Sequence, residues 1–336
     1  MRSRHLLATL LLPTVTLGMT ACAAGDDGDP GAGGGGAGPE VVVSAYPLQF
    51  IAEHVVGDAG TVTSVAPAGT EPHDLELSPS GVASLTSADV VLYLSDFQAA
   101  VDDAVAEAGS GTVVLDAAEW ADLLTTEEEH GDEEHAEEDE HAEDEHAEDE
   151  HAEEDEEHGH DHGGVDPHFW LDPARVADVA DGLAAALAET DPNSADVYTA
   201  NASALRAELE QLDSELAEGL SSCEQRSFVT SHEAFGYLAE AFELEQIGIS
   251  GLDPEAEPSP ARIADVLADA REAGVTTVFN EPGGIVAGAE EIAAELGVTL
   301  ATLNPIELEP SEELGSDYLG AMRTNLDALR EGLMCQ

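Results

Sequence analysis

The sequence predicts an α/β fold of two lobes, each a mainly parallel sheet flanked by helices, with one long helix joining the lobes. Short runs of β-branched residues and leucine, of strand length, alternate with helical patterns in both halves of the chain. Between the halves, an alanine-rich and leucine-spaced pattern is long enough for a helix that crosses from one lobe to the other. Alternating strands and helices fold into parallel sheets covered by helices, and ligands bind beyond the carboxyl ends of such strands, commonly in a cleft between lobes.

The first lobe is predicted over residues 40–190. Its strands are expected at residues 41–45, 61–66, 90–94 and 112–115, and its helices at residues 48–56, 79–86 and 97–108. The acidic stretch 127–164 interrupts this lobe as a disordered insertion, because blocks of like charge repel one another and bury nothing. After the insertion, Asp172 and Pro173 begin a further helix as its N-cap and first residue.

The linking helix is predicted over residues 191–222, with its start near Pro192, and the second lobe over residues 223–336. Strands of the second lobe are expected at residues 227–230, 246–250, 275–280 and 298–303, and helices at residues 233–242, 260–273, 289–296 and 316–333.

The N-terminus has the layout of a secretory signal over residues 1–21. Two arginines precede a short apolar stretch that is too short to span a bilayer, and small residues stand before Cys22. A cysteine at this place resembles a bacterial lipoprotein signal, in which Cys22 becomes the lipid-modified first residue; the alternative is an ordinary cleaved signal with a stray cysteine. Residues 22–39 are rich in glycine, alanine and aspartate and predict a flexible tether. We therefore expect an extracytoplasmic protein held at the cell membrane by lipid.

The net charge is -64, and the chain contains no lysine. Such a surface repels nucleic acids and anionic head groups, which are bound through Lys and Arg, so the expected partner is a cation. If lipid occupies Cys22, then Cys223 and Cys335 are the two remaining cysteines of an exported protein and are expected to form a disulfide. Two unrelated free thiols are the alternative.

The acidic insertion also carries eight of the thirteen histidines. They are His130, His135, His141, His146, His151, His158, His160 and His162. Imidazoles bind zinc, copper and nickel, and the surrounding carboxylates concentrate cations. Most of the spacings are five or six residues, which does not line up one helical face, so we expect several weak metal sites and no single preformed cage. The alternative is an acidic linker whose histidines are incidental.

Three histidines outside the insertion follow predicted strands or precede predicted helices in both lobes. His73 lies in a turn-rich loop after the second strand, His168 between the insertion and the next helix, and His232 at the end of the first strand of the second lobe. Each one alone could be an ordinary loop histidine. Their joint placement favours a site of three imidazoles with a fourth oxygen ligand, which suits tetrahedral zinc.

Four longer phrases surround these residues: GTEPHDLELSPS from residue 69, DPHFWLDP from 166, VTSHEAFGYLA from 229 and VFNEP from 278. Together they resemble the zinc-binding receptors of bacterial ABC importers, the ZnuA-like branch of the metal receptors, over essentially the whole mature chain. The resemblance implies two lobes joined by a rigid linking helix, with Zn(II) as cargo between them on His73, His168 and His232. It also implies that the zinc is handed to a membrane permease driven by a cytoplasmic ATPase.

The fourth ligand is where the sequence departs from the manganese-type pattern of these receptors. That pattern has a carboxylate in the loop after the late strand, where this chain has Asn304, a neutral and poorer ligand. A water, Glu71 or Glu281 could then complete the shell. For Glu281 we favour hydrogen bonding to a ligating imidazole. More imidazoles and fewer carboxylates favour zinc over manganese.

Other classes of function are weighed against this one. A zinc hydrolase needs an open metal position and a general base, and His232-Glu233 is not followed by the second histidine of a His-Glu-x-x-His helix, so we expect no enzyme. A receptor for manganese or another divalent metal remains an alternative, as does a surface metal buffer or adhesin in which the His-rich insertion is the functional element. We expect a monomer that binds no nucleic acid.

Overall fold

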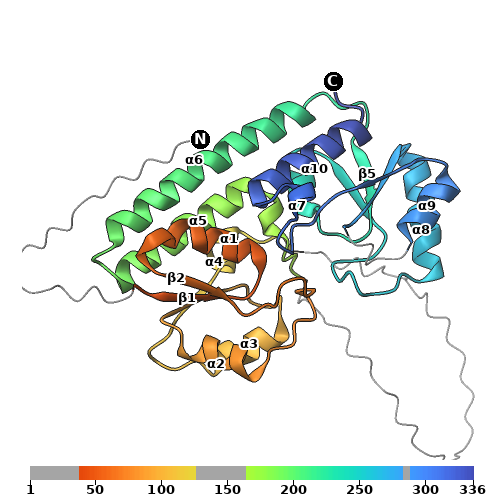
Figure 1. Ribbon diagram of the computed structural model, residues 1–336. Coiled ribbons are helices and arrows are strands. Elements are labelled where there is room, and N and C mark those ends of the chain that lie inside the picture. Colours follow the sequence, from red (N-terminus) through yellow and green to blue (C-terminus); the bar gives the residue numbers. More distant parts are fainter. Residues whose placement is uncertain (1–37, 126–163, 283–287) are drawn as a thin grey trace, which may run out of the picture. The chain divides into compact units, whose positions relative to one another are not determined.

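The computed structural model describes residues 38–125, 164–282 and 288–336, which contain two four-stranded sheets (Figure 1). The predicted signal with Cys22, most of the tether and the eight histidines of the insertion lie outside the described residues. Within the described residues, no helix is both long enough and apolar enough to cross a membrane.

The first sheet is entirely parallel, as the alternating pattern predicts. Its strands are β1 (Glu40–Val43), β2 (Thr61–Ser64), β3 (Val90–Tyr93) and β4 (Val113–Asp116), in the order β2-β1-β3-β4. The central strand β1 is buried on both faces because successive side chains alternate: Val41 and Val43 pack on one face and Val42 on the other. The chain leaves β1 toward β2 and returns on the other side to β3, so a topological switch point lies between β1 and β3.

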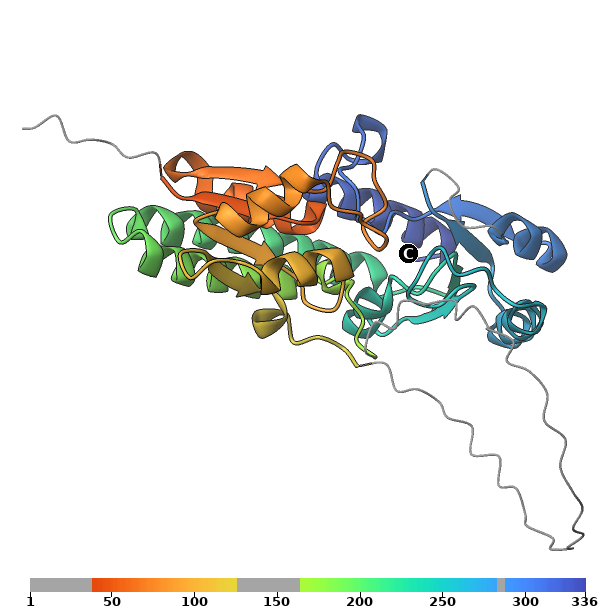
Figure 2. The same ribbon diagram turned by 90° about the horizontal axis from the view of Figure 1, so that it is seen from below.

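Helices cover both faces of this sheet (Figures 1 and 2). Helices α2 (Pro79–Ser87) and α3 (Ala99–Ala106) pack their Leu85 and Val101 against the face that carries Val42. Helices α1 (Tyr46–Val56) and α5 (Pro173–Thr190) cover the opposite face. A short helix α4 (Ala118–Ala121) and the 3-10 turns η1 (Gly57–Ala59) and η2 (Phe169–Leu171) complete the lobe.

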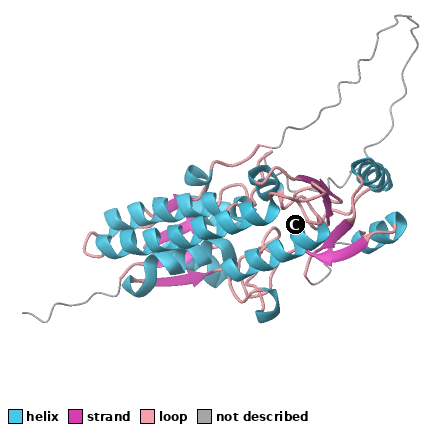
Figure 3. Cartoon of the chain, turned by 90° about the horizontal axis from the view of Figure 1, so that it is seen from above, coloured by secondary structure: helices cyan, strands magenta, loops and turns pink. Residues whose placement is uncertain are grey.

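The long helix α6 (Ala195–Leu220) packs on both lobes. It contacts α1 and α5 of the first lobe and α10 (Tyr318–Gly332) of the second (Figures 1 and 3). Its buried stripe recurs every three or four residues, as in an amphipathic helix: Tyr198, Ala202, Leu205, Leu209, Leu212, Leu216 and Leu220. The helix begins at Ala195, beyond the expected start, because Asp191 accepts hydrogen bonds from the backbone N–H of Asn193 and the hydroxyl of Tyr198 and closes a turn between α5 and α6.

The second sheet repeats the topology of the first. Its strands are β5 (Ser227–Thr230), β6 (Glu245–Gly248), β7 (Thr277–Asn280) and β8 (Thr299–Thr302), all parallel and in the order β6-β5-β7-β8. Its helices are α7 (Gly236–Ala241), α8 (Pro260–Ala273), α9 (Ala289–Leu296) and α10, with a 3-10 turn η3 (Glu312–Leu314) before α10. The switch point therefore lies between β5 and β7.

Cys223 and Cys335 form a disulfide in the structure, next to an antiparallel bridge between the same two residues. The bond joins the chain just after α6 to the chain just after α10. The predicted pairing of these cysteines therefore ties the C-terminus to the beginning of the second lobe.

Candidate metal centre

His73 comes from the loop that follows β2. Its backbone N–H donates to Oε1 of Glu71 at 3.1 Å, which closes the Glu71-Pro72-His73 turn. Its imidazole packs edge-on against Phe97 with ring centroids 5.0 Å apart, and the residue is 5% exposed. The loop thus turns His73 inward from the carboxyl end of the first sheet.

His168 comes from the segment that leads into α5, and Asp166 orients it. Oδ1 of Asp166 lies 2.9 Å from the backbone nitrogen of His168 and 2.8 Å from its Nδ1. An ionised carboxylate can only accept, so the bond to Asp166 keeps a proton on Nδ1 of His168, and Nε2, which faces Glu307, is the atom that can bind a metal once it has lost its own proton. Trp170 packs beside the ring at 5.3 Å between centroids, and its indole N–H donates to the carbonyl of Pro305 in the second lobe at 2.8 Å.

His232 stands just beyond the carboxyl end of β5, at the switch point of the second sheet. Its carbonyl accepts the hydroxyl of Thr230 at 2.7 Å and the side-chain amide of Gln246 at 2.8 Å, which fixes the turn. These bonds explain why α7 begins at Gly236 and not at residue 233 as the pattern predicts. Nδ1 of His232 lies 2.6 Å from Oε1 of Glu281, which follows β7. As in His168, the bond at Nδ1 leaves Nε2 as the atom that can bind a metal once it has lost its own proton.

Glu307 is the fourth member of the cluster and was not singled out in the sequence. It lies in the loop after β8, where Oδ1 of Asn304 accepts the N–H of Ile306 at 2.8 Å and Ile306 has a left-handed backbone, with φ 59°. Its Oε1 is 3.0 Å from Nε2 of His168, 3.2 Å from Nε2 of His232 and 3.5 Å from Nε2 of His73.

The four side chains form one buried group. Within the described residues, one ligand atom from each of His73, His168, His232 and Glu307 can be chosen so that all four lie within 4.8 Å of one another. The Nε2 atoms of His168 and His232 are 3.4 Å apart. Three nitrogens and one oxygen that converge from both lobes are a donor set that suits a tetrahedral zinc ion.

The residues expected as possible fourth ligands hold other positions. Glu281 bonds His232, Glu71 bonds the backbone of His73, and Asn304 holds the turn that precedes Glu307. Glu307 lies only three residues beyond Asn304, so a search of the whole loop for carboxylates would have found it.

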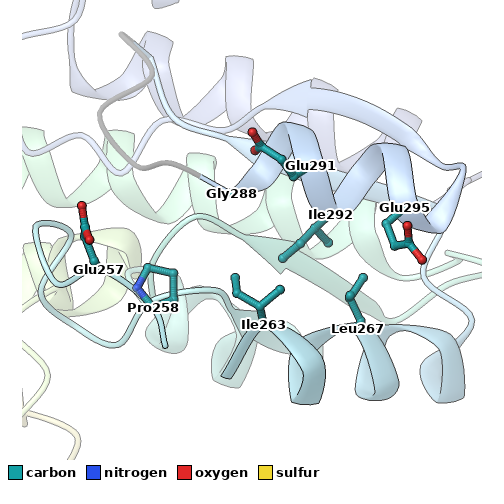
Figure 4. Close-up of a pocket in the computed structure, with 8 residues that line it drawn as sticks. All are labelled: Glu257, Pro258, Ile263, Leu267, Gly288, Glu291, Ile292 and Glu295. Carbon is teal, nitrogen blue, oxygen red and sulfur yellow. The ribbon is translucent and has the colours of Figure 1, made fainter. Parts of the chain in front are cut away.

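One cavity lies beside this cluster and a second lies apart from it. The cavity beside the cluster, of about 180 Å³, is lined by prolines and leucines and by the glutamates Glu71, Glu281, Glu307 and Glu309. A larger one, of about 620 Å³, lies between α8 and α9, where Ile263, Leu267 and Ile292 form an apolar wall and glutamates stand at the rim (Figure 4). The larger cavity contains no histidine and is separate from the four-residue cluster.

Burial and hydrogen bonds shift the pKa values of all four side chains of the cluster. Burial lowers the pKa of His73. Burial acts in the same direction on His168 and His232, but hydrogen bonds to carboxylates outweigh it, raising the pKa of His168 and raising that of His232 to about 10. Burial also disfavours the charged form of Glu307, yet hydrogen bonds from the three imidazoles hold its pKa well below its ordinary value. Protons thus supply the positive charge that a metal ion would supply.

We predict that zinc binding releases protons and strengthens with pH well above the ordinary histidine range. Because the pKa of His232 is raised to about 10, this imidazole holds a proton near pH 7 which zinc must displace, and the raised pKa of His168 acts in the same direction. Zinc affinity therefore falls as pH falls and increases until pH approaches about 10. Affinity should rise about one to two log units per pH unit between pH 7 and 9, according to whether one or two protons leave. Calorimetry in buffers of different ionisation enthalpy would count these protons, and an affinity that levels off above pH 7 would contradict the prediction.

A buried cluster of three imidazoles and one carboxylate, held between two lobes with parallel sheets, defines a metal-binding receptor of the two-lobed type. Residues 41–332 match the family model ZnuA, described as zinc-uptake complex component A, periplasmic. The chain belongs to the ZnuA family, which confirms the resemblance and the two-lobed α/β fold predicted from the sequence.

Individual relatives agree with this family. The chain is 33% identical over 299 residues to the high-affinity zinc uptake system protein ZnuA of Bacillus subtilis, covering 88% of this chain and 87% of that protein. It is 32% identical over 296 residues to the zinc-binding lipoprotein AdcA of Streptococcus pneumoniae, covering 87% of this chain but 55% of AdcA. The chain therefore spans about half the length of its AdcA relatives.

A solved structure shows the same fold. A zinc-bound variant of Streptococcus pneumoniae AdcAII has a TM-score of 0.72 and 28% sequence identity, and the match covers 88% of this chain and 98% of that one.

Proposed function

We propose that the protein is an extracytoplasmic, high-affinity zinc receptor that hands Zn(II) to an ABC permease with a cytoplasmic ATPase. The observation that carries this proposal is the convergence of His73, His168, His232 and Glu307, whose ligand atoms lie within 4.8 Å of one another and are buried. In this proposal all four are zinc ligands, with Asp166 and Glu281 orienting two of the imidazoles.

The donor set favours zinc over manganese and magnesium. Three imidazole nitrogens with one carboxylate oxygen match the preferences of zinc, whereas manganese and magnesium prefer oxygen ligands. A receptor must hold and later release its ion, and ligands contributed by both lobes allow a shift of one lobe to remove part of the shell. The site leaves no ligand position reserved for a reacting water, which supports transport over catalysis.

The proposed place of action is the outer side of the cell membrane. The Cys22 signal motif supports lipid attachment, and the relative from Streptococcus pneumoniae is named a lipoprotein. With no lysine and a net charge of -64, the chain is suited to a cation and not to nucleic acid. We propose that it acts as a monomer.

Removing the His-rich insertion should leave one tight zinc equivalent. The variant replaces residues 127–163 by a short Gly-Ser linker, which retains Gly164 and the bridge between Thr125 and Val165. Zinc titration of the metal-free protein should show the tight equivalent unchanged and the weaker equivalents gone, because the four buried ligands lie outside the replaced segment.

The matched variant keeps the insertion and replaces His73, His168 and His232 by alanine. It should lose the tight equivalent and keep the weak ones. The opposite pattern, in which the tight equivalent disappears with the insertion, would favour a surface metal buffer or adhesin and overturn the receptor function.

A further inference from the structure

The two ends of the insertion return to the fold side by side. Thr125 and Val165 form an antiparallel bridge, and the backbone N–H of Asp166 donates to the carbonyl of Leu124 at 3.0 Å. We call residues 124–125 and 165–166 the neck. The neck belongs to the first lobe, and its last residue lies two positions before His168.

One hydroxyl group from the second lobe binds both strands of the neck. Oη of Tyr237, on α7, accepts the backbone N–H of Leu124 at 2.8 Å and donates to the carbonyl of Asp166 at 2.6 Å. The tyrosine is fully buried. The guanidinium of Arg175 lies 4.8 Å from the ring centroid and pairs with Glu240 of α7 at 3.1 Å. The ring is therefore held independently of its hydroxyl.

The residue before Tyr237 makes room for the carboxylate of Asp166. A Cβ atom at Gly236 would lie 2.8 Å from Oδ2 of Asp166, closer than real Cβ contacts allow. The other oxygen, Oδ1, bonds both the backbone nitrogen and Nδ1 of His168. Two consecutive residues of α7 thus fix the backbone and leave space for the side chain of the aspartate that orients His168.

We propose that Tyr237 is a positioning residue for metal binding: from the second lobe it clamps the neck and Asp166, so that Asp166 holds Nε2 of His168 toward His232 and Glu307. This inference rests on the proposed zinc-receptor function. The hydroxyl of Tyr237 connects the neck, the contact between the lobes and the proposed ligand His168. Loss of that hydroxyl loosens the hold of Asp166 on His168 and shortens the lifetime of the bound ion.

The test is Tyr237→Phe in the full chain, which removes the hydroxyl and keeps the ring beside Arg175. Partners that orient a metal-binding histidine typically contribute 10–100-fold to metal affinity, so zinc dissociation measured with a chelator should be about 10-fold faster or more. The absorption spectrum of bound Co(II) should also change, because the geometry around His168 changes.

Tyr198→Phe is the matched control. Tyr198 is likewise fully buried, and its hydroxyl bonds Asp191 at 3.2 Å, at the start of α6 and outside the neck. It should leave both the zinc dissociation rate and the Co(II) spectrum at wild-type values.

A second variant tests whether Tyr237 acts through the aspartate. Asp166→Asn should also speed zinc dissociation, and adding Tyr237→Phe to it should have a clearly smaller effect than in the wild type. Additive effects would overturn the proposal, as would a Tyr237→Phe protein that has a lower melting temperature but wild-type zinc dissociation and Co(II) spectrum. Both outcomes leave the receptor function standing if the wild-type chain binds one tight zinc ion, whereas absence of that ion in the wild type would reject the function itself.

Discussion

Replacing Glu307 by glutamine should weaken zinc binding by about 100-fold or more at pH 7. Four-ligand zinc sites in small domains bind with about 10–16 kcal/mol, so removal of one ligand of four costs about 3 kcal/mol. Glutamine keeps the shape of the side chain but has no charge to neutralise zinc. It also removes the carboxylate whose hydrogen bonds help to raise the pKa values of His168 and His232. Proton competition then weakens, and the pH dependence of zinc affinity should become flatter.

Glu309→Gln is the control for this prediction. Glu309 lies on the same loop and lines the same cavity of about 180 Å³, but it is not a member of the four-residue cluster. It should change zinc affinity by less than a few-fold. Competition titration against a chelator of known affinity measures both variants, and equal affinities for Glu307→Gln and the wild type would remove Glu307 from the proposed ligand set.

Replacing His168 by alanine should weaken zinc binding by about 1,000-fold, more than the Glu307 change. The mutation removes a nitrogen ligand and also leaves Asp166 and Glu307 without the imidazole that both of them bond. Loss of one ligand costs about 3 kcal/mol, and alanine, unlike the glutamine at position 307, leaves no donor atom in its place.

The control is His54→Ala. His54 is an exposed residue of α1 whose Nδ1 is 2.8 Å from the carbonyl oxygen of Phe50, and it is not a member of the cluster. Titration of the metal-free His54→Ala and His168→Ala proteins with zinc measures the affinity of each. His54→Ala should keep the wild-type affinity, and a His168→Ala protein with wild-type zinc affinity would contradict the proposed site.

Much of the fold follows from local sequence pattern. The strands of parallel sheets are buried on both faces, so runs such as Val41–Val43 stand out from their surroundings. Helix starts are equally clear where a capping side chain precedes proline: Ser78 before α2, Asp172 before α5 and Ser259 before α8 each accept a backbone N–H. The start of α7 could not be read in this way, because distant Gln246 holds the turn at His232.

The three histidines could be found because their residue type is rare outside the insertion and they lie in loops, two after strands and His168 before a helix. Glu307 was missed because it is one of 73 acidic residues and its role depends on a left-handed turn at Ile306 and on rings far away in sequence; its place three residues beyond Asn304 is the one local signal for it. The clamp by Tyr237 was hidden for the same reason: its partners Leu124 and Asp166 are brought to it only by the packing of the two lobes.

A structure of the zinc-loaded protein, with anomalous scattering recorded at the zinc edge, tests the central claim most directly. We predict one strong peak between the lobes, about 2.0–2.1 Å from nitrogen atoms of His73, His168 and His232 and about 2.0–2.2 Å from an oxygen of Glu307. A peak bound by Glu71, Asn304 or water in place of Glu307, or strong zinc density only outside this cluster, would contradict the account.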